Sequence, residues 1–321
     1  MRWAKTGGQR LSMKGSFREW SVWLCVALVL GVLAVLAPAF FDPQPLLSRL
    51  TRETPTLVVA CGISLVIISR QIDISVGSQF AVCSVVAGLL AAAKLPFAVV
   101  LAAAVGAGAL QGALNGFLVA GLGLPSIVVT LATMVIGREA LRWGRQGQFV
   151  NLPDGLQWFG LPQSAGQWTL IALALWVLFG MATAMKHLAA GRFVYAVGSD
   201  AEAARLVGIP PRMVTWSLFV LVGALTGLAA LMNMVQSPQV DPKSGSGLEL
   251  RAIAAAVVGG VAISGGRGSL WGTFGGLLLL VTINPALTYL HVAPYWEKAI
   301  QGAIILLAVV ADGIRARRKN A

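Results

Sequence analysis

The sequence has few charged and few reactive side chains for its length. Only 11% of its 321 residues are Asp, Glu, Lys or Arg, and it contains 3 cysteines and 2 histidines. Cys25, Cys61 and Cys83 each lie alone in an apolar segment. They lack the paired spacing of a metal site or a redox motif. We therefore expect no metal ligands and no cofactor, and three small buried hydrophobic side chains instead.

The sequence also lacks the motifs of an enzyme. A serine nucleophile needs a base within reach, and the best pair on offer is the SGSG stretch at 244–247 with the isolated His291; His187 lies beside Lys186 at an expected helix end. The glycine-rich stretch 264–272 has no lysine after its glycines and no preceding strand, so it does not match a phosphate-binding loop. We expect no catalytic residue.

Long apolar runs dominate the chain. Hydrophobic residues make up 57% of the sequence and the mean hydropathy is +0.80, above an ordinary soluble domain. A membrane-spanning helix needs about 20 predominantly apolar residues, and about ten such runs are present. The sequence therefore predicts an all-α fold, a polytopic transmembrane helix bundle in the lipid bilayer. The expected spans are 20–38, 53–70, 76–93, 96–120, 125–143, 168–186, 213–235, 250–264, 269–290 and 297–313.

The formal charge of +12 marks membrane topology and does not indicate nucleic-acid binding. Basic residues gather before the first span, around the loop 187–212 and at the end of the chain. The positive-inside rule places all three groups in the cytoplasm. Ten spans place both termini and that loop on the same side. The polar, glycine- and proline-containing loops 144–167 and 236–249 then fall on the outer side.

No stretch of the chain is long enough to form a separate soluble domain. We expect a basic cytoplasmic segment at 1–19, a single transmembrane domain at 20–313 and a basic cytoplasmic tail at 314–321. Residues 37–39 (APA) resemble a signal-peptide cleavage site, but the preceding apolar run exceeds the roughly 7–15 residues of a signal peptide. A retained first helix is the preferred interpretation.

Two charges interrupt an apolar run in the segment 68–80 (ISRQIDISVGSQF). One charged side chain at mid-membrane costs about 2.5–3.5 kcal/mol on insertion scales, so Arg70 and Asp73 are expected to be paired or to lie near water. Gly77 and Ser78 follow, which favours a break between two helices. The break is either a structural hairpin or part of a substrate path. A proton relay between Arg70 and Asp73 would instead indicate a proton-coupled secondary carrier.

Small residues recur at four-residue spacing in three expected helices. This spacing lets helix backbones approach closely, either for packing alone or for sliding during gating. The glycines are Gly108, Gly112 and Gly116, then Gly223 and Gly227, then Gly268, Gly272 and Gly276.

A polar stretch at 198–211 (GSDAEAARLVGIPP) stands out from its apolar surroundings. Ser199 is expected to cap a short helix and Glu202, three residues on, to complete a capping box. Gly208 and Pro210 are typical stop signals. The segment is either a docking element for a cytoplasmic partner or a simple solvated connection.

Four stretches resemble the membrane permease subunits of bacterial ATP-binding-cassette importers for monosaccharides, the ribose, rhamnose and autoinducer-2 class. They are IDISVGS (72–78), LNGFLVAGLGLPSIVVTLATM (114–134), GRFVYAVGSDAEAARLVGI (191–209) and GSGLELRAIAAAVVGGVAISGGRGSLWGTFGG (245–276). The likeness runs from about residue 20 to 313, and the order of the four motifs matches the family.

The resemblance implies that the loop 187–212 carries a short cytoplasmic coupling helix, seated in a cleft of a separate ATPase subunit. It also implies a periplasmic sugar-binding protein on the outer loops, a second permease subunit forming a homo- or heterodimer, and a place in the bacterial inner membrane. The residues expected to couple to the ATPase are Gly191, Ser199, Asp200, Glu202, Ala203, Ala204, Arg205 and Gly208.

The substrate is expected to be a monosaccharide or a similar small polyol. Many relatives carry two glycines where this chain has Arg70-Gln71, a form closer to the rhamnose and autoinducer-2 branch, with ribose next. Asn284-Pro285 stands where relatives often have paired asparagines. The polar residues expected to line the pathway, or else to form ordinary interhelical hydrogen bonds, are Asp73, Gln111, Asn115, Asn233 and Asn284.

Overall fold

The computed structural model describes residues 8–289 and six isolated helical positions beyond them, 296, 299, 302, 303, 306 and 310. His291, most of the expected span 297–313 and the basic tail 314–321 lie outside the described residues. The described chain is helical apart from turns and one short strand pair, so the all-α prediction is confirmed. The helices are α1 (Gly8–Leu36), α2 (Pro43–Ile68), α3 (Val76–Ala92), α4 (Phe97–Gly116), α5 (Ser126–Arg145), α6 (Gln163–His187), α7 (Ala189–Ser199), α8 (Ala201–Leu206), α9 (Pro211–Met234), α10 (Leu248–Val258) and α11 (Leu270–Tyr289).

Prolines mark where many of these helices begin. Pro43 and Pro211 occupy the first position of α2 and α9, where the missing backbone N–H costs no hydrogen bond. Pro96, Pro125 and Pro162 directly precede α4, α5 and α6. Short turns complete the connections: η1 (Pro38–Phe41), the π-helical turn η2 (Phe117–Gly121) and η3 (Gln157–Gly160).

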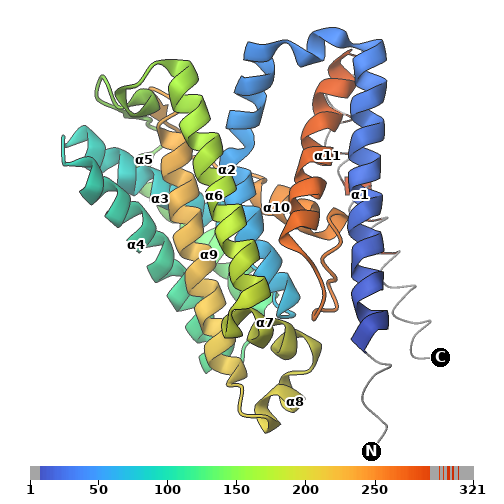
Figure 1. Cartoon of the computed structure of the whole chain (residues 1–321). Coiled ribbons are helices and arrows are strands. Elements are labelled where there is room, and N and C mark those ends of the chain that lie inside the picture. Colours follow the sequence, from blue (N-terminus) through green and yellow to red (C-terminus); the bar gives the residue numbers. More distant parts are fainter. Residues whose placement is uncertain are drawn as a thin grey trace, which may run out of the picture.

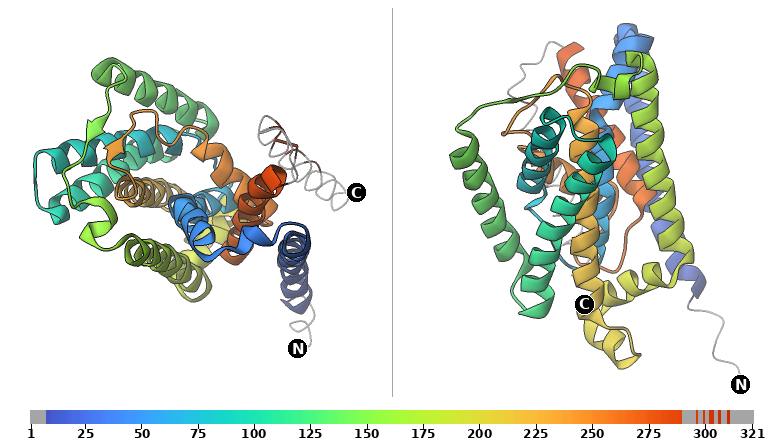
Figure 2. Two further views of the ribbon diagram at one scale, coloured as in Figure 1. Left: turned by 90° about the horizontal axis from the view of Figure 1, so that it is seen from above. Right: turned by 90° about the vertical axis from the view of Figure 1, so that its left-hand side faces the viewer.

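The helices form one bundle with α2 at its centre (Figure 1). Helix α1 stands at one side next to α11, and α4 lies at the opposite side. α7 and α8 form a small helical unit at one end of the bundle, and a long connection from α5 to α6 crosses the other end (Figure 2). α2 is 89% buried along its most apolar stretch, compared with 22% for α4 and 22% for α6, so it forms the core.

α4 and α9 pack through their glycines. A Cβ atom at Gly108 would collide with the backbone of Gly223, and one at Gly112 with that of Phe219. A Cβ at Gly227 would collide with the backbone of Ala104. The backbones are therefore in direct contact, and the expected close approach is confirmed for this pair.

A second glycine contact joins α10 and α11. Gly272 lies against Gly259, and Gly276 lies against Ala255. Gly268 does not belong to this stripe, because it lies in the loop before α11 with φ +155°. Its expected place in the helical repeat was wrong.

Within residues 8–289, the expected spans correspond to helices with one clear exception. Among the described residues four helical segments are long and apolar enough to cross a membrane, namely α2, α4 with η2, α6 and α9. Shorter apolar helices lie at Trp20–Leu36, Val76–Ala92 and Leu270–Ile283. The span expected at 250–264 is instead α10, whose 11 residues are only about 16 Å long. The count of ten crossings stays a prediction.

The first helix begins earlier than expected. α1 starts at Gly8, ahead of the expected span 20–38. The cytoplasmic place of the segment 1–19 stays a prediction.

Candidate functional site

The expected coupling loop, residues 187–212, forms a compact unit at one end of the bundle (Figure 1). α7 has 11 residues and packs against the end of α6, and α8 has only 6. Gly208 ends this unit with φ +85°, a left-handed conformation that favours glycine. Pro210 and Pro211 then lead into α9. The expected short helix, ended by its predicted stop signals, is present.

Asp200 caps α8, and the expected capping box was wrong. Oδ1 of Asp200 accepts hydrogen bonds from the backbone N–H groups of Glu202 and Ala203, at 2.9 and 3.0 Å. Ser199 lies one residue too early, as the last residue of α7, and its hydroxyl donates to the carbonyl of Tyr195 at 2.8 Å. An aspartate suits this position because its negative charge meets the positive end of the helix dipole.

Glu202 pairs with Arg205 instead of reaching back to the cap. Nη2 of Arg205 lies 2.6 Å from Oε1 of Glu202, and Nε lies 3.1 Å from Oε2, a bidentate pair. The hydrogen bond to Glu202 raises the pKa of Arg205. Both side chains are exposed, at 64% and 68%. They therefore present a fixed pair of opposite charges on the outer face of α8.

The remaining coupling residues divide into an inner and an outer set. Gly191 is buried, and a Cβ there would collide with the backbone of Met185 in α6, so Gly191 holds α7 against the bundle. Ala204 is also buried, whereas Ala203 is exposed. Leu206 and Val207 are 76% and 75% exposed. The outer face thus combines an ion pair, a small residue and an apolar tip.

A buried polar network lies at the break between α2 and α3. We call Asp73, Ser75, Gln79 and Asn115 the Ser75 cluster. The Ser75 hydroxyl donates to Oδ1 of Asp73 at 2.5 Å, and it accepts from Gln79 Nε2 at 2.6 Å and from Asn115 Nδ2 at 2.8 Å. The Ser75 backbone N–H also donates to Asp73 Oδ1, at 2.9 Å. All four side chains are essentially buried.

The Ser75 cluster leaves three acceptor oxygens without partners among the described residues. They are Oδ2 of Asp73, Oε1 of Gln79 and Oδ1 of Asn115. Buried polar atoms normally have a hydrogen-bond partner, so this group of acceptors can receive hydrogen bonds from water or from a bound solute. The expected break is confirmed, and two of the expected pathway residues, Asp73 and Asn115, meet at one hydroxyl.

Ser75 and Gln79 were missed by sequence reasoning. Both lie within or next to the IDISVGS stretch, four residues apart at the start of α3. Their polar side chains in an apolar run were the available signal. The contact with Asn115 joins residues 40 positions apart, which spacing within one helix does not reveal.

The other expected pathway residues do not join the Ser75 cluster. Gln111 donates to the carbonyl of Ala107 at 3.1 Å within its own helix and to Sγ of Cys83 at 3.9 Å. Asn233 is half-buried near the end of α9 that is far from α8 (Figure 1). Asn284 belongs to α11, and its side chain lies outside the described part of the structure.

Arg70 and Asp73 bind different groups. The Arg70 guanidinium donates to the backbone carbonyls of Ser199 and Ser264, while Asp73 accepts only from Ser75. The two charges are therefore not paired with each other among the described residues, and of the two expectations, pairing or a place near water, the exposed Arg70 fits the second. The glycine-rich stretch 264–272 provides a tight turn at Gly265 and Gly266, both with positive φ.

The two loops 144–167 and 236–249 are joined at the end of the bundle opposite α8. Strand β1 (Val150–Asn151) pairs antiparallel with β2 (Gln239–Val240). Next to the strands, the N–H of Leu152 donates to the carbonyl of Pro238, and that of Trp158 to the carbonyl of Val235. The loops therefore form one connected surface.

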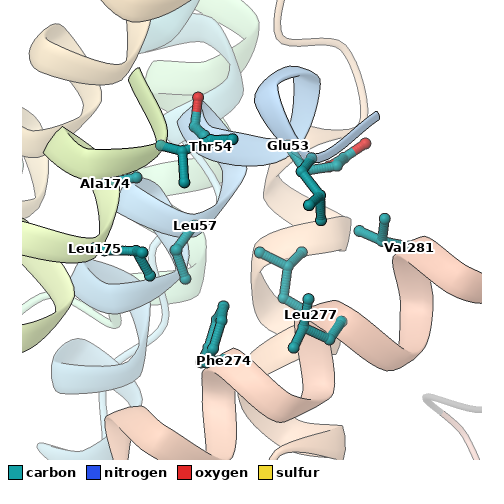
Figure 3. Close-up of a pocket in the computed structure, with 11 residues that line it drawn as sticks. Glu53, Thr54, Leu57, Ala174, Leu175, Phe274, Leu277 and Val281 are labelled. Carbon is teal, nitrogen blue, oxygen red and sulfur yellow. The ribbon is translucent and has the colours of Figure 1, made fainter. Parts of the chain in front are cut away.

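A cavity of about 230 Å³ lies between α2, α6 and α11 (Figure 3). Leucines, Phe274 and other apolar side chains line it, and the polar residues at its wall are Glu53 and Thr54. Oε1 of Glu53 lies 3.7 Å from Nη1 of Arg251 in an ion pair. A sugar site requires convergent polar groups that fix the orientation of the ligand. This apolar cavity does not provide them.

Comparison with known proteins identifies the family. The model of the branched-chain amino acid transport system permease component matches residues 46–309. The autoinducer 2 import system permease protein LsrC of Enterobacter sp. (strain 638) is 34% identical over 299 residues, 92% of this chain and 87% of that protein. The ribose import permease protein RbsC of Escherichia coli (strain K12) is 31% identical over 316 residues, 95% and 97% of the two chains. No solved structure is significantly similar to this chain.

The matched range contains all four stretches that carry the resemblance. The relatives are covered almost from end to end, so the similarity concerns the whole permease. This chain belongs to the family of branched-chain amino acid transport system permease components, and it is a permease of the kind found in ATP-binding-cassette importers of monosaccharides.

Proposed function

We propose that this chain forms the membrane pathway of an importer for a small hydroxyl-rich solute, driven by a separate ATPase subunit docked on α8. The coupling loop carries this proposal. A short helix, capped by Asp200 and followed by the exposed Leu206 and Val207, projects from a bundle in which four described helical segments are long and apolar enough to cross a membrane. An exposed apolar tip with charges beside it is typical of a protein contact.

The Ser75 cluster supports a polyol as the transported solute. Its three unpartnered atoms are all acceptors, and one belongs to a carboxylate. Hydroxyl groups can donate to all of them. Autoinducer-2, rhamnose and ribose all meet this requirement. The relatives named as import permeases for autoinducer 2 and for ribose support these two solutes.

The same proposal assigns the two ends of the bundle. The α7–α8 end faces the cytoplasm of a bacterium together with the chain termini, which agrees with the basic residues at Lys186, Arg192 and Arg212. The connected surface of loops 144–167 and 236–249 faces the periplasm and receives a sugar-binding protein. A second permease subunit completes the pathway, and transport proceeds by rocking of the helices around the buried site.

Uptake into proteoliposomes tests the proposal. The permease is co-purified with its ATPase and reconstituted with ATP inside the vesicles and sugar-loaded binding protein outside. We expect uptake of radiolabelled sugar that requires ATP and ignores a proton gradient. Asp73→Asn, which removes the carboxylate but keeps an acceptor for Ser75, should reduce uptake without loss of folded protein.

The secondary carrier is the outcome that would contradict this proposal. Uptake that follows an imposed proton gradient, occurs without ATP and is lost in Asp73→Asn would establish it. The separation of Arg70 from Asp73 weighs against it, because a relay needs the two groups in contact.

A further inference from the structure

Arg70 ends α2 in a left-handed turn. Its φ is +64°, and the N–H groups of Arg70 and Gln71 donate to the carbonyls of Ile67 and Val66, which is a common way to end a helix. The backbone of the turn is therefore held locally, and the Arg70 side chain is free to contact other segments.

The Arg70 side chain bridges two segments far away in the sequence. Nη2 donates to the carbonyl of Ser199 at 2.6 Å, and Nε donates to the carbonyl of Ser264 at 2.8 Å. Ser199 ends α7, where the negative end of the helix dipole favours a cation. The planar guanidinium can hold both carbonyls at once with separate N–H groups. Arg70 thus ties the coupling loop to the loop between α10 and α11.

Backbone contacts reinforce this junction. The N–H of Gly266 donates to the carbonyl of Ile68 at 2.8 Å, and the hydroxyl of Tyr195 in α7 donates to the carbonyl of Gly268, also at 2.8 Å. A Cβ at Gly198 would collide with the Ile68 carbonyl, and one at Gly265 with Cγ of Arg70. The ends of α2 and α7 and the loop 260–269 are packed without space between them.

The chain leads directly from Arg70 to the Ser75 cluster. Residues 71–74 form no regular helix, and Asp73 follows Arg70 by only three positions. On the way, Ile72 contacts α5: its N–H donates to the Ser126 hydroxyl at 3.2 Å, and its carbonyl lies 3.4 Å from the Thr130 hydroxyl, which donates to the Ser126 carbonyl at 2.8 Å. The segment is short and held at both ends, so a shift at Arg70 displaces Asp73.

We propose that Arg70 is a positioning residue that transmits movement of the coupling loop to the Ser75 cluster. Movement of α7 pulls on Arg70 through the Ser199 carbonyl, and Arg70 moves residues 71–75 and the loop 260–269 with it. The inference rests on the proposed function, since it assigns to this junction the step between ATPase movement and the buried polar site. Arg70 itself touches neither the solute nor the nucleotide.

The test replaces Arg70 without disturbing the turn. Arg70→Asn keeps a residue that tolerates the left-handed conformation but cannot reach both carbonyls. Arg267→Asn is the matched control: it removes the same charge from the exposed loop beside Arg70, and no side-chain hydrogen bond is described for Arg267. Both variants are purified as the complete complex with the ATPase and binding protein, in nanodiscs.

We expect Arg70→Asn to assemble normally and to keep basal ATP hydrolysis, while stimulation by the sugar-loaded binding protein falls about fivefold or more, the range of typical couplings between distant sites. Arg70→Lys should recover part of this stimulation, and Arg267→Asn should match the wild type. Weaker assembly of Arg70→Asn with the ATPase would instead make Arg70 a direct docking contact and overturn the inference. Unchanged stimulation would overturn it as well.

Hydrogen exchange of the permease gives a second readout that does not depend on transport. Loss of the Arg70 bridge should speed amide exchange in residues 71–79 and 264–268 in Arg70→Asn but not in Arg267→Asn. Equal exchange in the two variants would refute the link even if the importer proposal holds. If the wild-type complex shows no ATP-dependent uptake, the proposed function fails, and the exchange data still decide whether Arg70 connects the two segments.

Discussion

Two aspartates in this chain accept backbone N–H groups just ahead of a helix but lie in opposite surroundings. Asp200 is the N-cap of α8 and accepts the N–H groups of Glu202 and Ala203, whereas Asp73 lies two residues before Ser75, the N-cap of α3, and accepts the N–H of Ser75. Asp73 is completely buried, and its second oxygen has no partner among the described residues. Asp200 is exposed. The same local chemistry therefore serves a buried polar site in one region and a docking surface in the other.

The two regions differ in how much folding free energy is lost when one of their hydrogen bonds is broken. In the buried region every lost partner leaves a polar group away from water, which is expensive. At the exposed end water replaces a lost partner, so the same change costs little. Substitutions that remove a hydrogen-bond partner from the Ser75 cluster should therefore affect folding and function together, whereas substitutions on α8 should affect function with little effect on folding.

The largest effect is expected for Ser75→Ala. It leaves the side-chain N–H groups of Gln79 and Asn115 without their described acceptor, at about 1–3 kcal/mol each, so stability should fall by about 2–6 kcal/mol. Thermal unfolding in detergent measures this as a lower Tm. Ser84→Ala is the matched control on the same helix, because the buried Ser84 hydroxyl has no partner among the described residues. A similar loss in both variants would contradict the assigned network.

Asp200→Ala should have a smaller and local effect. Loss of the cap costs about 1 kcal/mol, and in a helix of 6 residues this should increase amide exchange across 201–206 while the Tm of the bundle stays unchanged. Ser199→Ala removes a hydroxyl next to the cap and should leave α8 exchange as it is. If Ser199→Ala increased amide exchange across 201–206 and Asp200→Ala did not, Ser199 would be the cap.

The smallest effect on stability is expected for the Glu202–Arg205 pair. An exposed pair of this spacing on a helix contributes about 0.3–0.5 kcal/mol. A double-mutant cycle of Glu202→Gln and Arg205→Gln should therefore show coupling near this size in the isolated permease. If α8 docks into an ATPase, the same substitutions should weaken assembly of the complex much more than they weaken the fold. If the substitutions had equally small effects on assembly and on stability, α8 would be a solvated connection without a docking role.

Much of the fold follows from the sequence, because apolar runs and prolines determine where these helices lie and begin. The clearest error in span length was α10, since an apolar run cannot show that the chain turns back after Val258. The cap of α8 was misassigned by one residue because Ser199 and Asp200 are both good caps, and the end of α7 decides between them.

The candidate site was only partly predictable. Asp73 was recognisable as a charge within an apolar run, and Asn115 as a polar residue in a helix. Their meeting at Ser75 depends on how α3 packs on α4, and the Arg70 contacts join residues 129 and 194 positions apart. A pattern within one helix contains no information on such contacts. The sequence left open whether Arg70 and Asp73 are paired or lie near water, and only the packing shows that each binds a different group.

The most direct test of the account is ATP hydrolysis by the permease–ATPase complex in nanodiscs, with and without binding proteins loaded with autoinducer-2, rhamnose or ribose. The account predicts that one loaded binding protein stimulates hydrolysis and that Asp200→Ala abolishes most of this stimulation while the permease stays folded. A complex whose hydrolysis ignores every loaded binding protein, or whose stimulation survives disruption of α8, would contradict the role of the coupling loop.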